Sequence, residues 1–157
     1  MDTKSTDIVR SLTLEEKARL CSGDGYWHTA ALPLKGVPAI MMTDGPHGLR
    51  KQQEAEDHLG LSASEPATCF PAACAMANSW NVELMHEVGG ALGEECLAQG
   101  VSVLLGPGIN MKRSPLCGRN FEYFSEDPHH TAHMASALVR GVQERGIGCA
   151  VKHFALN

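Results

Sequence analysis

The sequence predicts a parallel α/β fold. Three short apolar runs, at residues 39–43, 101–105 and 149–151, have the length of buried strands, and two longer amphipathic stretches separate them. A parallel pair of strands needs a crossover connection, so this alternation of strand and helix favours a parallel sheet. With 157 residues, of which 43% are hydrophobic, the chain is long enough for one core.

The first part of the chain predicts one helix and one strand. Thr13 and Glu16 fit a capping box, in which each side chain accepts a backbone hydrogen bond from the other residue, so a helix is expected over 14–20. The apolar run 39–43 is bounded by Pro38 and by Asp44-Gly45-Pro46, which indicates a buried strand. The polar stretch 51–65 has no apolar period and predicts a surface excursion.

The remainder of the chain predicts two strand and two helix elements. Residues 81–99 form an amphipathic helix that Gly100 ends, followed by a strand over 101–105. Residues 130–145 form a second helix, followed by a strand over 149–151. The apolar stripes expected to face the core are, in the first helix, Leu84, Met85, Val88, Leu92 and Cys96 and, in the second, Met134, Leu138 and Val142.

Charge and composition exclude several classes of partner. The formal net charge of -5 offers no positive field for phosphate backbones or acidic lipid, so neither nucleic acid nor a membrane is expected as a partner. No apolar stretch is long enough to span a bilayer, and the first residues lack the apolar core of a signal peptide, so a cytoplasmic protein is expected. The six scattered cysteines are expected to be reduced thiols.

Polar groups follow each of the three predicted strands. Asp44 follows the first, a loop from Arg113 to Glu122 follows the second, and Lys152-His153 follows the third. The carboxyl ends of parallel strands share one face, so these groups are expected to meet there. Each group also has a structural explanation: Asp44 could cap a turn, Arg119 could pair with Glu122 or Asp127, and Lys152-His153 could be a solvated strand end.

A pocket with carboxylate, guanidinium, ammonium and imidazole groups suits a neutral, polyhydroxylated ligand. Two adjacent sugar hydroxyls can donate to one carboxylate, while the cationic groups donate to hydroxyl oxygens. Trp27 or Trp80 could stack on a sugar face, although packing in the core or at a helix end is favoured for Trp80.

A metal site formed by histidines is an alternative interpretation. His129, His130 and His133 lie together at a helix start, and His47 and His58 are the other histidine pair. Because no nearby acidic or cysteine ligands complete either set, a solvated histidine cluster is favoured, and neither a metal nor another cofactor is expected.

Several motifs, in order, resemble the amino-terminal domain of family three glycoside hydrolases, in their β-glucosidase branch. The resemblance extends from about Leu12 to Asn157 and is carried by the following runs: Leu12-Thr-Leu-Glu-Glu-Lys17, Thr43-Asp-Gly-Pro46 with Gly48 and Arg50, Gly106-Pro-Gly-Ile-Asn110, Arg113-Ser-Pro-Leu-Cys-Gly-Arg-Asn-Phe-Glu122, Ser125-Glu-Asp-Pro128 and Lys152-His-Phe154.

The resemblance implies a retaining, metal-independent enzyme that hydrolyses terminal non-reducing β-D-glucosyl residues from β-glucosides or oligosaccharides. It implies that residues 1–157 are the amino-terminal portion of one barrel domain, the first half of a (β/α)8 TIM-type barrel, with later strands and further domains missing. The substrate-binding residues it implies are Asp44, Arg50, Arg119, Lys152 and His153. The nucleophilic Asp and the acid/base Glu are expected downstream, so the chain alone is expected to be inactive.

Two alternatives stay open, and one branch of the family is disfavoured. The β-N-acetylhexosaminidase branch has a second histidine shortly after its Lys-His pair, whereas this chain reads Lys152-His-Phe-Ala-Leu-Asn157. A β-xylosidase of the same family is not excluded, because the residues that contact the hexose hydroxymethyl group cannot be identified. A non-catalytic carbohydrate-binding chain is the other alternative.

Overall fold

The computed structural model describes residues 3–52, 63–155 and 157, and divides the chain into two compact units, Met1–Met42 and Thr43–Asn157. The polar stretch predicted over 51–65 lies largely outside the described residues. None of the described helices combines the length and apolar character needed to span a bilayer.

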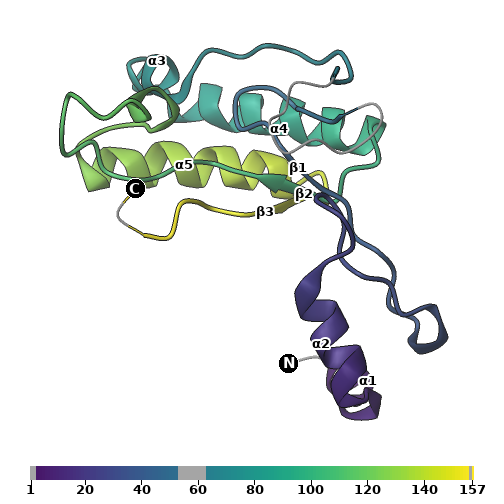
Figure 1. Cartoon of the computed structure of the whole chain (residues 1–157). Coiled ribbons are helices and arrows are strands. Elements are labelled where there is room, and N and C mark those ends of the chain that lie inside the picture. Colours follow the sequence, from purple (N-terminus) through teal and green to yellow (C-terminus); the bar gives the residue numbers. More distant parts are fainter. Residues whose placement is uncertain (1–2, 53–62, 156) are drawn as a thin grey trace. The chain divides into compact units, whose positions relative to one another are not determined.

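The first unit contains two helices and a paired loop (Figure 1). Helix α1 (Thr3–Ser11) was not predicted. Helix α2 (Leu14–Ser22) begins with the predicted capping box, in which Glu16 N donates to Thr13 Oγ1 at 3.1 Å and Thr13 N donates to Glu16 Oε2 at 2.8 Å. The loop after α2 contains the short 3₁₀ helix η1 (Pro33–Lys35).

The second unit is built on a three-stranded sheet in the order β1-β2-β3, formed by β1 (Met42–Asp44), β2 (Val103–Leu105) and β3 (Gly148–Cys149). Strands β2 and β3 are parallel, with Val103 opposite Gly148 and Leu104 opposite Cys149. The α/β class and the parallel crossover are therefore as predicted.

The strands are shorter than the apolar runs that predicted them. Ala39 and Ile40 precede β1 instead of belonging to it, and Ile40 is 39% exposed. The backbone of Ile40 is satisfied by Thr29, whose N–H donates to Ile40 O at 3.0 Å and whose Oγ1 accepts from Ile40 N at 2.9 Å. Pairing with this loop therefore replaces pairing in the sheet for the first half of the run.

Helices α4 (Val82–Ala98) and α5 (Pro128–Gln143) lie side by side and supply most of the core (Figure 1). Both start within two residues of the predicted positions, 81 and 130. Their N-caps are Asn81 and Asp127, whose side chains accept from backbone N–H groups of the first turn. The side chains that are at most 1% exposed include Met85, Leu92 and Cys96 of α4, Met134, Leu138 and Val142 of α5, and Leu104 of β2. Leu84, which was expected in the stripe, is 40% exposed.

Two short helices complete the second unit and were not predicted. Helix α3 (Ala73–Ala77) contributes three buried residues, and the 3₁₀ helix η2 (Asn120–Glu122) lies within the loop that follows β2. The placement of η2 matters for the polar site, because it carries Glu122 and follows Arg119 directly.

Glycines let α4 and α5 approach closely. A Cβ atom on Gly89 would overlap the backbone of Leu138, and one on Gly141 would overlap the backbone of His86. Gly90, the next residue of α4, is different, because its Cβ atom would meet only the Arg145 side chain, 3.4 Å from Nη2.

This difference makes a matched pair of substitutions informative. Both Gly89→Ala and Gly90→Ala gain about 1 kcal/mol of helix propensity. We expect Gly90→Ala to be neutral or stabilising, and Gly89→Ala to lower stability by about 1–3 kcal/mol because the helices must separate. Thermal unfolding of the protein that carries this chain measures both, and equal melting temperatures for the two variants would contradict the close approach.

Candidate functional site

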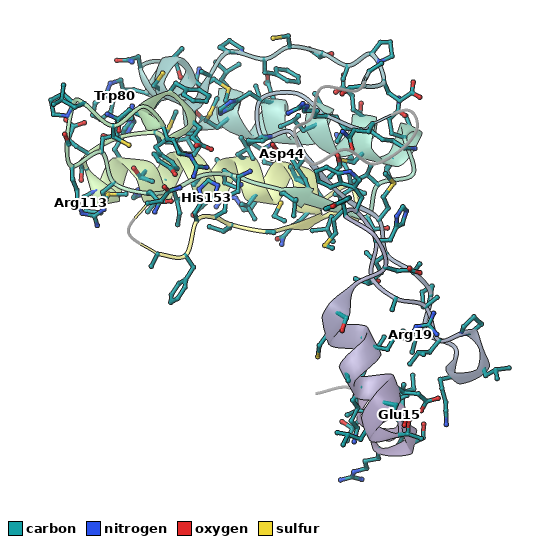
Figure 2. The ribbon with its side chains drawn as sticks, in the orientation of Figure 1. Glu15, Arg19, Asp44, Trp80, Arg113 and His153 are labelled. Atoms are coloured by element: carbon teal, nitrogen blue, oxygen red, sulfur yellow. The ribbon has the colours of Figure 1, made fainter. Side chains whose placement is uncertain are left out.

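The three strand ends and the loop after β2 bring the polar residues of the second unit together. Asp44 is the last residue of β1, and Gly108, just beyond β2, bridges to both Lys152 and Tyr123. Lys152 N donates to Pro107 O at 3.1 Å, and Ile109 N donates to Lys152 O at 2.8 Å. The backbone after β3 is therefore held against the loop after β2. Figure 2 labels Asp44, which ends β1, and His153, which follows β3; β1 and β3 are the two outer strands of the sheet.

An ion pair joins the ends of β1 and β3. Lys152 Nζ donates to Asp44 Oδ1 at 2.7 Å, and the Lys152 and Asp44 side chains are 20% and 41% exposed. Lys152 is thus not the solvated strand end that was one alternative. The Asp44 carboxylate remains open enough to accept from a ligand as well.

A second group of hydrogen bonds surrounds His153. Arg119 Nε donates to Glu122 Oε1 at 2.5 Å, and Arg119 Nη2 donates to His153 Nε2 at 2.8 Å. Because a guanidinium only donates, Nε2 accepts, and the ring proton of a neutral His153 is therefore on Nδ1. That proton is donated to Tyr123 Oη, 3.0 Å away.

The backbone of His153 is fixed as firmly as its ring. Asn110 Nδ2 donates to His153 O at 3.0 Å, and His153 N donates to Asn110 Oδ1 at 2.6 Å. One amide side chain therefore satisfies both polar backbone groups of the residue that carries the imidazole.

Burial and neighbouring cations keep His153 neutral. Burial lowers the pKa of His153, and the Arg119 guanidinium lowers it further, while the Glu122 carboxylate acts in the opposite direction. Asp44 and Lys152 also act on this pKa, which places the ion pair and the Arg119 group in one electrostatic environment. The neutral state agrees with the hydrogen bond that Nε2 accepts.

His47 is a further member of the cluster, three residues after Asp44 in the turn that follows β1. Ala73 N, in the first turn of α3, donates to His47 Nε2 at 3.0 Å, and the ring of His47 contacts that of Phe121 edge to face at 6.4 Å. Burial lowers the pKa of His47, the Glu122 and Asp44 carboxylates raise it, and Lys152 lowers it. His47 was considered in the sequence only as a metal ligand.

The structure brings together four of the five predicted site side chains: Asp44, Arg119, Lys152 and His153. The fifth, Arg50, lies beside Asp44 through its backbone, since Arg50 N donates to Asp44 O at 2.9 Å, and its side chain is exposed. Arg119 takes Glu122, rather than Asp127, as its partner. The residues that the prediction missed are His47, Asn110, Glu122 and Tyr123.

The cluster has the chemistry of a site for a neutral polyol. Two carboxylates, Asp44 and Glu122, face two cations, Lys152 and Arg119, so the four charges balance. The imidazoles of His47 and His153 add neutral donors and acceptors. Such a set can exchange hydrogen bonds among its own members for hydrogen bonds to hydroxyl groups without leaving a charge unpaired.

Of the two tryptophans considered as stacking platforms, Trp80 belongs to the second unit and Trp27 to the first. Trp80 is 72% exposed and stacks on His130 with ring centroids 4.0 Å apart, so it lies at a helix end and outside the core. Trp27 belongs to the first unit, where its carbonyl accepts from Met42 N. Figure 2 shows Trp80 and Arg113 in the same part of the second unit, well separated in the view from Asp44 and His153.

The histidines at the start of α5 do not form a metal site in the structure. His130 is 8% exposed and its Nε2 hydrogen-bonds to Ala77 O, so it is a core residue rather than part of a solvated cluster. His133 Nδ1 hydrogen-bonds to His129 O at 2.9 Å, and His58 lies outside the described residues. Within residues 3–52, 63–155 and 157, no three His, Cys, Asp or Glu side chains are placed to hold a metal ion.

Comparison with known proteins gives a consistent set of matches. Residues 25–157 match the model of the glycosyl hydrolase family 3 N terminal domain. Thermostable beta-glucosidase B of Acetivibrio thermocellus is 59% identical over 150 residues, which are 96% of this chain and 20% of that protein. An exo-alpha-(1->6)-L-arabinopyranosidase of Bifidobacterium longum is 53% identical over 158 residues, 100% of this chain and 21% of that protein.

Solved structures of beta-glucosidases are similar to this fold as well. Beta-glucosidase 3B of Thermotoga neapolitana, whose structure was solved in complex with glucose, superimposes with a TM-score of 0.87 at 42% identity, covering 98% of this chain and 23% of that one. The chain thus spans about a fifth of the length of the curated relatives it matches.

The neutral imidazole of His47 predicts acid sensitivity. The pKa of His47 lies below its ordinary value of 6.5 in the folded chain, so the unfolded chain binds the proton more readily, and stability falls as pH drops through about 6.5. In His47→Gln the side-chain amide oxygen can still accept from Ala73 N, but nothing titrates. We expect the melting temperature of this variant to fall less than that of the wild type between about pH 7.5 and about pH 5.5. Identical losses would contradict the assignment.

Proposed function

The chain belongs to glycosyl hydrolase family 3, and on that premise we propose that it supplies the sugar-binding part of an enzyme that hydrolyses terminal non-reducing β-D-glucosyl residues from β-glucosides. The observation that supports this most strongly is the convergence of Asp44, Lys152, Arg119 and His153 from the ends of β1 and β3 and from the intervening loop. The glucose complex of the Thermotoga neapolitana enzyme supports the choice of sugar.

The proposed roles follow from hydrogen-bonding capacity. Asp44 accepts from two adjacent hydroxyls of the terminal sugar, as its partly exposed carboxylate can do. Lys152, already paired with Asp44, and Arg119 donate to hydroxyl oxygens. His153 is neutral, so it can accept from a hydroxyl at Nε2 in place of Arg119. Arg50, adjacent to Asp44 along the backbone, is proposed as a further binding residue at the edge of the site.

The reaction itself needs two more carboxyl groups. A retaining glycosidase uses one as nucleophile and one as acid and then base, on either side of the glycosidic bond. Both carboxylates of the cluster are engaged by cations, Asp44 by Lys152 and Glu122 by Arg119, which suits binding or the positioning of binding groups and not nucleophilic attack. We therefore assign the nucleophile and the acid/base to parts of the whole protein outside residues 1–157.

The three-stranded sheet is proposed to be the first part of a (β/α)8 barrel. An apolar groove of about 560 Å³ runs along α5 and the chain after β3. Its lining includes Val151, which is 52% exposed, and Thr131, whose buried Oγ1 lacks a hydrogen-bond partner among the described residues. Later strands and helices of a barrel would cover these groups and pair with β3.

A pentopyranose is the second candidate substrate, and one observation favours it. The Bifidobacterium longum relative, 53% identical, is named an exo-alpha-(1->6)-L-arabinopyranosidase. β-Xylosides are likewise pentopyranosides. In the proposed site the cluster binds ring hydroxyls. A β-D-xyloside presents these as a β-D-glucoside does and differs only at the fifth ring carbon, whereas an α-L-arabinopyranoside also differs from the glucoside in configuration at the fourth ring carbon.

A panel of aryl glycosides tests the proposal and its alternative together. The whole protein is expected to release the aryl group fastest from the β-D-glucoside, because the relatives named beta-glucosidases and the glucose complex of the Thermotoga neapolitana enzyme support glucose as the sugar. Steady-state kcat/KM values for the β-D-glucoside, the β-D-xyloside and the α-L-arabinopyranoside rank the candidates. A higher value for either pentoside would replace glucose by that sugar, and no release from any of them would overturn the proposed function.

The Asp44–Lys152 pair provides a second prediction. In the whole protein, Asp44→Ala or Lys152→Ala should reduce kcat/KM on an aryl β-glucoside by roughly 30- to 1000-fold, the equivalent of about 2–4 kcal/mol, since each removes a charge-assisted hydrogen bond to the sugar. Lys17→Ala, an exposed lysine on α2, serves as the matched control and should leave kcat/KM unchanged. Kinetics like those of the wild type in both Asp44→Ala and Lys152→Ala would refute the site assignment.

A further inference from the structure

We infer that Glu122 is the positioning residue of this site: its buried carboxylate holds the Arg119 guanidinium, and through it the His153 ring, in the arrangement that meets the sugar, without touching the sugar itself. The inference rests on the proposed function. It concerns a residue whose apparent role in the sequence is only to close the arginine loop.

Exposure separates Glu122 from the groups proposed to bind sugar. Its side chain is 11% exposed, less than that of every group proposed to bind sugar in the cluster: Lys152 is 20% exposed, His153 25%, Asp44 41% and Arg119 46%. A carboxylate so enclosed can be reached by its neighbours but not by a pyranose ring lying over the cluster. Glu122 therefore acts through the groups it contacts.

The groups near the Glu122 carboxylate, Arg119 and His153, are among those proposed to bind the sugar. Arg119 Nε donates to Glu122 Oε1 at 2.5 Å, and the other oxygen, Oε2, lies 3.9 Å from His153 Nε2. The same guanidinium donates from Nη2 to that imidazole nitrogen at 2.8 Å. The carboxylate therefore holds the guanidinium directly through Nε, and it holds the ring only through that guanidinium, whose Nη2 donates to the imidazole.

Hydrogen bonds on both sides of Glu122 fix its backbone. The residue ends the 3₁₀ helix η2, and its N–H donates to Arg119 O at 3.2 Å. The next residue, Tyr123, is 1% exposed and bridges to Gly108, just beyond β2. At the other end of η2, Asn120 Nδ2 donates to Ser114 O at 2.8 Å, which ties the arginine loop to itself.

Loss of the carboxylate would release the guanidinium. Arg119 is nearly half exposed, and its remaining hydrogen bond would be to a neutral imidazole that a sugar hydroxyl can displace. A long side chain freed in this way regains rotamer entropy, so the bound arrangement becomes less populated. The effect on catalysis should be a loss of orientation rather than of a contact.

A double-mutant cycle on the whole protein tests the inference. Glu122→Gln keeps the size of the side chain and one acceptor oxygen but removes the charge. We expect it to reduce kcat/KM on an aryl β-glucoside roughly 10- to 100-fold and to weaken competitive inhibition by glucose by a similar factor. In an Arg119→Met background, adding Glu122→Gln should change kcat/KM by less than about threefold, because the residue through which Glu122 acts is already gone.

Stability provides a readout that separates positioning from folding. Arg119→Met leaves a buried carboxylate unpaired, so its melting temperature should fall and should recover when Glu122→Gln is added. Should Glu122→Gln not fold, Glu122→Asp, which shortens the reach of the carboxylate, is used for the kcat/KM arm of the cycle with the same expectation; because it keeps the charge, no recovery of the melting temperature is expected from it in the Arg119→Met background.

The outcomes are distinct. A wild-type protein without activity on aryl glycosides would remove the proposed function and this inference with it. An active wild type with unaltered kcat/KM in folded Glu122→Gln would overturn the positioning role alone. Losses that multiply in the double variant would overturn it as well, because they would show that Glu122 acts independently of Arg119.

Discussion

The ion pair between Lys152 and Asp44 joins residues 108 positions apart in the chain, and the site exists only where these two meet. Asp44 ends β1 and Lys152 follows β3, with β2 between the two strands. In the observed order β1-β2-β3 the pair spans the end of the central strand, which requires the ends of β1 and β3 to lie at the same edge of the sheet. With strands of three, three and two residues, the sheet itself offers few hydrogen bonds to hold this order.

Helices α4 and α5 supply the apolar packing that the short sheet lacks. The side chains of α4 and α5 that are at most 1% exposed, among them Met85, Leu92, Met134 and Leu138, form the apolar core against which β2 packs through Leu104. The close approach of the helices at Gly89 and Gly141 makes that core tight. Polar chemistry at the strand ends is thus positioned by apolar packing some distance away, which is the general division of labour in α/β folds.

Periodicity predicted most of this framework, and local chemistry predicted part of the site. The capping box of α2 and the stripes of α4 and α5 are signals that depend only on nearby residues, and the structure confirms the capping box, the α5 stripe and, of the α4 stripe, the buried positions Met85, Leu92 and Cys96. Helix α3 was missed because its cap, Ala72, has no polar side chain and five residues are too few for a helical period. The strands were predicted too long because an apolar run does not specify its partner, and Ile40 pairs with Thr29 outside the sheet.

The site could be predicted as a list of groups but not as a network. Asp44, Lys152 and His153 each follow an apolar run directly, which is visible in the sequence. The burial of Glu122 depends on the 3₁₀ helix η2 and on the bridge from Tyr123 to Gly108, and no local sequence pattern predicts either of them. His47 is neutral because of its burial and the donor at Ala73, both of which are tertiary properties.

A crystal structure of the whole protein with glucose bound tests the central claim most directly. The account predicts a pyranose ring at the ends of β1–β3, with two of its hydroxyl oxygens about 2.5–3.0 Å from the Asp44 carboxylate and others within hydrogen-bond distance of Lys152 and Arg119. Glucose bound at another place, with the Asp44–Lys152 pair contacting no hydroxyl group, would contradict it.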